Sequence, residues 1–273
     1  MASTQGKECD PGHESLADNG EPDAKRHRIG DNAFVVKTLI FIRHGQSEYN
    51  AACAACPKED PWIRDAPLTA EGREQAKNAQ AELHCILNEL HVDSSLLTVV
   101  SSPMRRAIET ALLVNPDAGG HIELWPQLRE NVDPDLDLGT PASLLRASKL
   151  VELACGVDAP SLQDLNEVWW TVPPELSEMS PGTDMEEAFR KSSKRFEETD
   201  QARLPTRLEE LVDLIANVPK QILMIVAHAG LIGSLSKHLG LKDEIDGRLG
   251  WRLRNAEVRV ARDVQLPKKS FKM

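Results

Sequence analysis

The sequence predicts an α/β protein, a three-layer α/β/α sandwich around a mostly parallel sheet. Nearly continuous apolar runs at 34–42, 96–101 and 222–227 are typical of strands buried on both faces of a parallel sheet. Amphipathic segments with apolar residues at helical spacing lie between these runs. Buried strands that alternate with helices indicate a sheet covered by helices on both faces.

The remaining elements can be placed in chain order. Thr69 can cap a helix over 70–91, whose apolar residues repeat at helical spacing. Five further helices are expected to begin at Ser102-Pro103, at Thr140-Pro141, at Thr183 with Glu186, at Thr206 with Glu209, and at Gly230. Gly156 is placed to end the helix that begins at Thr140-Pro141, and Gly240 to end the helix that begins at Gly230. Shorter strands are expected at 121–125 and 256–261.

One folded domain is expected at 33–265. Residues 1–32 are rich in Gly, Asp, Glu, Ser and Pro, which predicts a disordered N-terminal extension, and 266–273 is expected to be a basic C-terminal tail. The segment 126–205 has helical patterns but no good strand. We therefore expect it to be a helical insertion, or cap, over one edge of the sheet.

Composition and charge exclude several classes of protein. The chain has 273 residues, is 41% hydrophobic and has a mean hydropathy of −0.37. It has no apolar run of about 18 residues and no secretory signal, so we expect no membrane association and a cytoplasmic location. A net charge of −11 argues against a nucleic-acid-binding protein. The pair Cys53 and Cys56 supplies only two ligands, so neither a metal site nor a redox centre is expected.

Basic side chains follow the three strong strands directly. Arg43 and His44 follow the first, Arg105 and Arg106 the second, and His228 the third. Ligands of parallel sheets bind beyond the carboxyl ends of the strands, so we expect these side chains to converge. Arginine matches the oxygens of a phosphate group, and a neutral imidazole can attack phosphorus. The sequence therefore predicts a phosphoryl-transfer site at this edge.

Five blocks along the chain carry a family resemblance. Arg-His-Gly-Gln-Ser-Glu-Tyr-Asn at 43–50 resembles the signature of the histidine phosphatase superfamily, in its phosphoglycerate mutase-like branch. The other four blocks, in order, are similar to later motifs of that family: Pro67-Leu68-Thr69-x-x-Gly72, Ser101-Ser102-Pro103-x-x-Arg106-Ala107, Leu128-Arg129-Glu130 and Val226-Ala227-His228-Ala229-Gly230. The resemblance spans about 34–260 and implies a phosphoglycerate mutase-like fold.

The resemblance implies roles for particular residues. His44 would be the nucleophile that becomes phosphorylated, and Glu130 would protonate the leaving alkoxide and then activate water. The phosphate pocket would be completed by Arg43, Asn50, Arg106 and His228. Helical phase places Arg106 opposite the apolar stripe of its helix, so its choice over Arg105 rests on the resemblance alone. Four nearby acids compete with Glu130 for the acid role: Glu123, Asp133, Asp135 and Asp137.

The implied activity is that of a phosphatase without cofactor or metal ion, acting on a phosphorylated small molecule or a phosphopeptide. A phosphoglycerate mutase is one alternative. Mutases of glycolysis follow the acid with a Glu-Arg-x-Tyr-Gly stretch, whereas this chain reads Glu-Asn-Val-Asp-Pro-Asp-Leu-Asp-Leu-Gly at 130–139, which disfavours that activity. A catalytically silent protein that binds a phospho-ligand is the other alternative, and the full set of His44, Arg106, Glu130 and His228 disfavours it. The substrate and the oligomeric state stay open.

Two further features have two interpretations each. Trp169 and Trp170 either pack the core of the insertion or form a wall of the substrate pocket. Asn255 and Glu257 resemble an Asn-x-Glu step that lies beneath the site in part of the family, and a purely structural role is equally compatible with the sequence.

Overall fold

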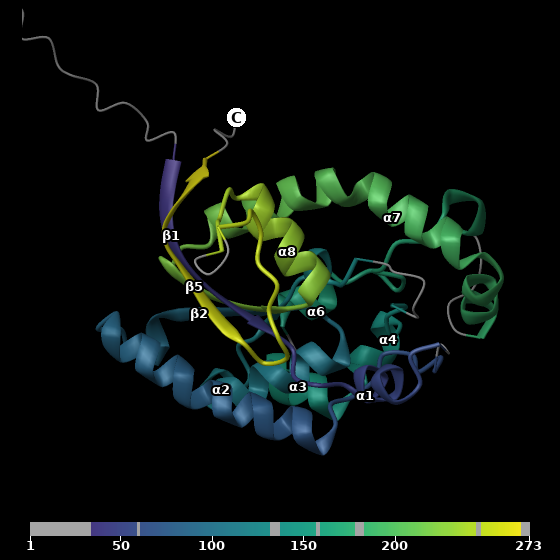
Figure 1. Cartoon of the computed structure of the whole chain (residues 1–273), viewed down its shortest axis with the longest axis horizontal. Helices are drawn as coiled ribbons and strands as arrows, with labels where there is room; N and C mark the ends of the chain where they lie inside the picture. Colours follow the sequence, from purple (N-terminus) through teal and green to yellow (C-terminus); the bar gives the residue numbers. More distant parts are fainter. Residues whose placement is uncertain are drawn as a thin grey trace, which may run out of the picture. The chain divides into compact units, whose positions relative to one another are not determined.

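The computed structural model describes residues 34–58, 61–131, 137–156, 159–177, 183–243 and 247–268. The predictions for 1–32, for Asp133 and Asp135 and for the last five residues lie outside these ranges. Within them the protein is a mixed α/β structure around one mostly parallel sheet, as predicted (Figure 1).

The sheet has the strand order β3-β2-β4-β1-β5. Its strands are β1 (Phe34–Arg43), β2 (Leu97–Ser101), β3 (Glu123–Leu124), β4 (Ile222–Ala227) and β5 (Val258–Pro267). β1, β2, β3 and β4 run parallel, and β5 pairs antiparallel with β1. β5 continues two residues beyond the domain end expected at 265, and Leu266, opposite Val35, is fully buried. The short β3 and the antiparallel β5 form the two edges.

Helices cover both faces of this sheet (Figure 1). They are α1 (Glu48–Ala55), α2 (Ala70–Glu89), α3 (Arg105–Val114), α4 (Ala142–Arg146), α5 (Lys149–Cys155), α6 (Pro160–Gln163), α7 (Thr183–Asn217) and α8 (Ala229–His238). Side chains of β1 alternate between the layers, as the period of a strand requires. Ile40 and Ile42 pack with α2 and α3, whereas Leu39 and Phe41 pack with α8 and the second half of α7.

Two predicted helices differ in extent from the structure. α3 begins at Arg105 and not at Pro103, because Ser102 Oγ accepts a hydrogen bond from Met104 N at 3.3 Å and holds these residues in a turn. The segment from Thr140 to Gly156 forms two helices, α4 and α5, and not one. Between them Ser148 N donates to Leu145 O at 2.9 Å, which interrupts the regular helical pattern.

The helix start predicted at Thr206 is wrong. α7 continues through Pro205, and its break lies at Ser192, where φ is −141° and ψ is 29°. Proline normally bends or ends a helix because it lacks the N–H group. Here both parts of the helix are anchored by buried side chains, Phe196 before Pro205 and Leu211 after it, so packing outweighs the missing hydrogen bond. The described part of the segment 126–205 contains helices and no strand.

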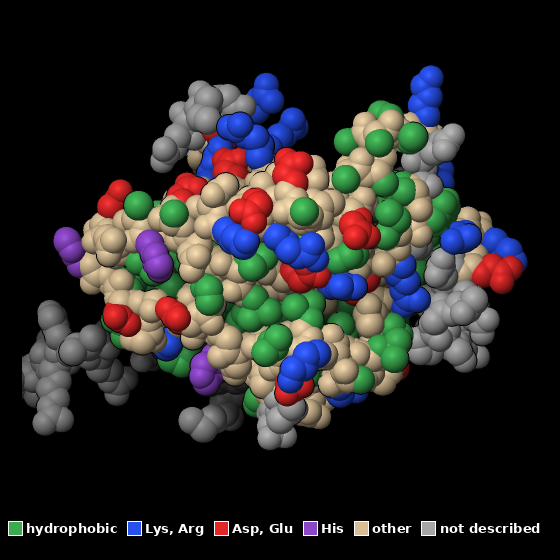
Figure 2. All heavy atoms as spheres, turned by 90° about the horizontal axis from the view of Figure 1, so that it is seen from below, with side chains coloured by type: hydrophobic (Ala, Val, Ile, Leu, Met, Phe, Trp, Pro, Cys, Tyr) green, Lys and Arg blue, Asp and Glu red, His purple; other side chains and the backbone are tan. Residues whose placement is uncertain are grey.

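The surface mixes both signs of charge. Figure 2 shows one face, on which acidic and basic side chains are interspersed. No helix within the described ranges has the length and apolar character needed to cross a membrane.

The backbone of the loop that follows β1, at Gly45 and Gln46, passes very close to the backbone of Gly72 in the first turn of α2. A Cβ atom at Gly72 would overlap the carbonyl oxygen of Gln46. We therefore expect Gly72→Ala to destabilise the protein by about 1–3 kcal/mol through overpacking, although alanine is the better helix former. The measurement is the free energy of unfolding in denaturant. Asn78→Ala, at an exposed position of the same helix, is the matched control and is expected to be neutral or stabilising; equal effects of both changes would contradict the packing argument.

Candidate active site

The carboxyl ends of β1, β2 and β4 bring His44, Ser102 and His228 together. β4 lies between β1 and β2, so the residues that follow the three strands are neighbours. His44 N donates to Ala227 O at 3.0 Å, and Ser102 N donates to Val226 O at 3.0 Å. The rings of His44 and His228 are both buried, and their centroids lie 5.1 Å apart. The convergence predicted from the strand order is therefore present.

The hydrogen bond of His44 determines its tautomer. Nδ1 lies 2.7 Å from Gly45 O, and since a carbonyl oxygen only accepts, Nδ1 carries the proton. The lone pair of the neutral ring is then on Nε2. Burial lowers the pKa of His44 well below the usual 6.5, and the charges of Arg106 and Arg43 lower it further, against the opposing effect of the Gly45 bond. His44 is thus held neutral, with Nε2 available as a nucleophile.

His228 is neutral for similar reasons. Burial lowers its pKa well below 6.5, followed by the charge of Arg106. Its Nε2 lies 2.9 Å from the hydroxyl of Ser102, which fixes the ring. Its Nδ1 is buried and has no hydrogen-bond partner among the described residues.

We expect NMR titration to show both imidazoles protonating below pH 6.5. Arg106→Gln should raise both pKa values, because Arg106 is the largest charge effect on each ring. The unfolded chain binds these two protons at a higher pH than the folded one, so the free energy of unfolding should fall as the pH drops below about 6.5. An ordinary histidine pKa for His44 in the wild type would contradict this account.

Of the two adjacent arginines, Arg106 is the one at the site. Its side chain is only 9% exposed and pairs with Asp137 at 2.9 Å. The side chain of Arg105 is 52% exposed, does not line the cavity and pairs with the buried Glu109 at 2.9 Å. Arg106 lies off the apolar stripe of α3 and is nevertheless buried, because Asp137 packs against it at the edge of the cavity.

Arg43 and Asn50 line the same cavity as His44 and Arg106. Arg43 Nη1 donates to Leu253 O at 3.1 Å, and burial lowers the pKa of its guanidinium. Asn50 Oδ1 accepts from Ser47 N at 3.2 Å in the capping box of α1, and from Asn255 Nδ2 at 3.3 Å. Asn255 Nδ2 also lies 3.1 Å from His44 O, so Asn255 supports the backbone of the histidine from below.

Glu130 lies at the amino end of α8. Its carboxylate accepts backbone hydrogen bonds from Leu231 at 2.9 Å, from Gly230 at 3.2 Å and from Asn131 at 2.8 Å. A Cβ atom at Gly230 would lie 2.7 Å from Glu130 Oε1, which explains the glycine. Of the competing acids, Glu123 binds the Trp125 indole at a different cavity, and Asp137 is paired with Arg106.

These side chains line a cavity of about 620 Å³. It includes His44, Arg43, Asn50, Arg106, Glu130 and Asp137. We name it the catalytic cavity. Its volume is within the range that suits a small molecule.

Other residues singled out from the sequence lie elsewhere. Trp169 and Trp170 do not line the catalytic cavity: they pack in the core at 7% and 5% exposure and face a second cavity. The Trp169 indole donates to Thr140 O at 2.8 Å. Cys53 and Cys56 are free thiols on α1 and at its end. The described ranges contain no group of three or more His, Cys, Asp and Glu side chains suited to a metal ion.

The fold and the cavity define an α/β protein with a cavity at the carboxyl ends of its parallel strands, lined by His44, Arg43 and Arg106. Residues 39–137 match the model of the histidine phosphatase superfamily (branch 1), so this part of the chain is similar to that superfamily.

Known proteins resemble this chain in part. A glucosyl-3-phosphoglycerate phosphatase of Mycolicibacterium vanbaalenii is 34% identical over 95 residues, which are 35% of this chain and 36% of that protein. The match thus spans about a third of the length of this relative. A phosphoglycerate mutase of Bacillus anthracis aligns with 86% of this chain and 93% of its own at 24% identity and a TM-score of 0.47. A mycobacterial glucosyl-3-phosphoglycerate phosphatase in complex with VO3 aligns with 85% and 100% at 21% identity and a TM-score of 0.43.

Proposed function

We propose that the protein is a phosphatase that hydrolyses a phosphomonoester through a phosphohistidine on His44. The observation that carries the proposal is the buried, neutral His44, whose free Nε2 lies in one cavity with Arg43, Arg106 and Glu130. The phosphatase activity of the relative in Mycolicibacterium vanbaalenii supports this activity. The volume of the catalytic cavity, about 620 Å³, supports a phosphorylated small molecule as the substrate.

The reaction would proceed in two displacements. Nε2 of His44 attacks phosphorus, and the P–O bond to the leaving group breaks while the Glu130 carboxyl donates a proton to that oxygen. Arg43, Arg106 and His228 bind the charged phosphoryl oxygens during the transfer. The Glu130 carboxylate then takes a proton from water, which attacks the phosphohistidine, and inorganic phosphate leaves with His44 restored.

We assign this chemistry to a domain that begins at about 33 and continues to the end of β5 at Pro267, with 126–205 as its cap, in the cytoplasm and without cofactor or metal ion. The test is hydrolysis of an aryl phosphate by the wild-type protein in excess chelator. Turnover at the same rate with and without chelator is expected. Loss of turnover that added metal restores would contradict the mechanism, and so would the lack of any hydrolysis across a panel of phosphorylated metabolites.

Asp137 competes with phosphate for Arg106 in this mechanism, since the two side chains form an ion pair at 2.9 Å. Asp137→Asn should therefore strengthen inhibition by the product, inorganic phosphate, by about tenfold, the effect of one charge-assisted hydrogen bond. The measurement is the inhibition constant of phosphate with an aryl phosphate as substrate. Asp117→Asn, at an exposed position outside the catalytic cavity, serves as the control. An unchanged or weaker inhibition in Asp137→Asn would refute the competition.

A further inference from the structure

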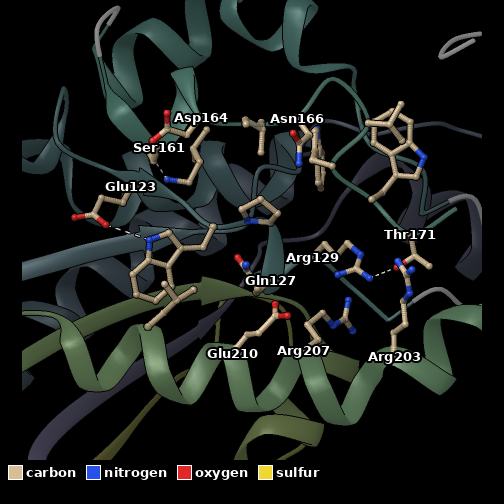
Figure 3. Close-up of a pocket in the computed structure, with 18 of the residues that line it drawn as sticks. Glu123, Gln127, Arg129, Ser161, Asp164, Asn166, Thr171, Arg203, Arg207 and Glu210 are labelled. Carbon is tan, nitrogen blue, oxygen red and sulfur yellow. Dashed lines mark hydrogen bonds between the residues drawn. The ribbon is translucent and has the colours of Figure 1, made fainter. Parts of the chain in front are cut away.

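A second cavity lies next to the catalytic cavity, on a neighbouring face of α7. It has a volume of about 910 Å³ and is lined by α7, by the segment after Leu124 and by residues 161–171 (Figure 3). Asp200 and Leu204 of α7 face the catalytic cavity, whereas Arg203 and Arg207 face the second one. The volume of the second cavity is also within the range of small-molecule sites.

One end of the second cavity is cationic. Arg129, Arg203 and Arg207 line it near Thr171, where Figure 3 shows their guanidinium groups close together. Two of these residues are buried, at 8% exposure for Arg129 and 4% for Arg207. Buried cations are costly unless negative charge compensates them.

A single described carboxylate, that of Asp200, lies within ion-pair distance of these buried arginines. Arg129 Nη2 donates to Asp200 Oδ1, and Arg207 Nη2 lies 3.5 Å from Asp200 Oδ2. Arg203 forms no ion pair with any residue that the structure describes. In Figure 3 the acids Glu123 and Asp164 lie at the other end of the cavity, whereas Glu210 lies beside Arg207. The three arginines at the Thr171 end therefore outnumber the two carboxylates beside them, those of Asp200 and Glu210.

The same end has too few hydrogen-bond acceptors. Arg129 Nε, Arg207 Nε and Trp170 Nε1 are buried, and none of them has an acceptor among the described residues. Buried donors are nearly always paired in folded proteins. An anion would supply both the missing charge and additional acceptors.

We propose that this end of the second cavity binds the phosphate or carboxylate group of a small organic anion, at a site separate from the catalytic cavity. The guanidinium groups of Arg129, Arg203 and Arg207 would bind the anionic group. The polar side chains Gln127, Ser161 and Asn166 line the rest of the cavity together with apolar ones such as Trp125 and Leu165, and suit an organic body that carries hydroxyl groups.

The electrostatics of Arg129 agree with an anion at this place. Burial lowers the pKa of Arg129 to about 10, and the charge of Arg207 lowers it next, against the opposing effect of Asp200. Negative charge in the cavity would raise this pKa again and stabilise the buried cations.

Calorimetric titration with inorganic phosphate at constant ionic strength tests the site. The wild-type protein should bind two phosphate ions, one in each cavity. Arg106→Ala should lose only the catalytic event. Arg203→Ala, an exposed change that leaves the Asp200 ion pairs intact, should weaken the second event at least tenfold. The control Lys194→Ala, at an exposed position on the same helix that lines neither cavity, should bind as the wild type does.

Two results would overturn the proposal: a single phosphate event that Arg106→Ala abolishes, or a second event that Arg203→Ala and Lys194→Ala affect equally. The titration measures binding and not turnover, so it remains decisive even if the proposed phosphatase activity fails. A gain of thermal stability on adding phosphate to Arg106→Ala, absent in the double variant Arg106→Ala/Arg203→Ala, is the expected second readout.

Discussion

Replacement of His44 by alanine is expected to lower turnover of any phosphomonoester by at least about 10⁴-fold, because the covalent route depends on this one nucleophile. His44 is the residue whose Nε2 is free, neutral and directed away from its Gly45 hydrogen bond. His228, with its Nε2 at the Ser102 hydroxyl, is less suited to replace it. The measurement is the rate of aryl phosphate hydrolysis by purified variants of equal stability.

Two further observations separate a lost nucleophile from a damaged fold. His238→Ala, an exposed change at the end of α8, should retain the wild-type rate. Rapid quenching of the wild-type protein with a labelled substrate should trap an acid-labile phosphoryl group that His44→Ala lacks. Substantial turnover by His44→Ala, or a trapped label that persists in it, would remove His44 from the nucleophile role.

Glu130→Gln is expected to lower the rate with an alkyl phosphate by about 10²–10⁴-fold, the usual contribution of a general acid and base. Glutamine retains the shape of the side chain and an oxygen that can accept from Gly230 and Leu231, so the start of α8 should remain intact. The loss should be smaller with an aryl phosphate, because a good leaving group needs less protonation.

The dependence on the leaving group is the decisive measurement for Glu130. A series of phosphomonoesters with graded leaving-group pKa should give a steeper dependence of kcat/KM on that pKa in Glu130→Gln than in the wild type. Glu123→Gln, which removes a competing acid located at the second cavity, should leave the series unchanged. If kcat/KM depends equally steeply on the leaving-group pKa in Glu130→Gln and in the wild type, Glu130 is not the general acid and another group has that role.

Much of the fold follows from local pattern. The apolar run at 34–42 has no polar alternation, and β1 is covered on both faces from Leu39 to Ile42, whereas Phe34 and Val36 at its start are exposed. Helix boundaries were less predictable because they depend on contacts made elsewhere in the chain. Pro205 has the local signature of a helix boundary, yet burial of Phe196 and Leu211 keeps α7 helical around it.

The site residues that directly follow a predicted strand could be predicted from the sequence. His44 and His228 follow adjacent parallel strands, so their proximity follows from topology. The burial of Arg106 was not predictable from helical phase, because its partner Asp137 comes from a segment 31 residues away. The ion pair between Arg129 and Asp200, which are 71 residues apart, and the cavity beside it have no local sequence signal.

The ion pair between Arg106 and Asp137 has a consequence for an enzyme that works in the presence of its own product. An empty cavity of bare guanidinium groups would fill with inorganic phosphate and remain occupied between turnovers. With Asp137 bound to Arg106, phosphate has to displace an internal anion before it can bind Arg106, which weakens the binding of the product. The ester part of the substrate would add contacts that phosphate lacks, so the complete ester is favoured over the product.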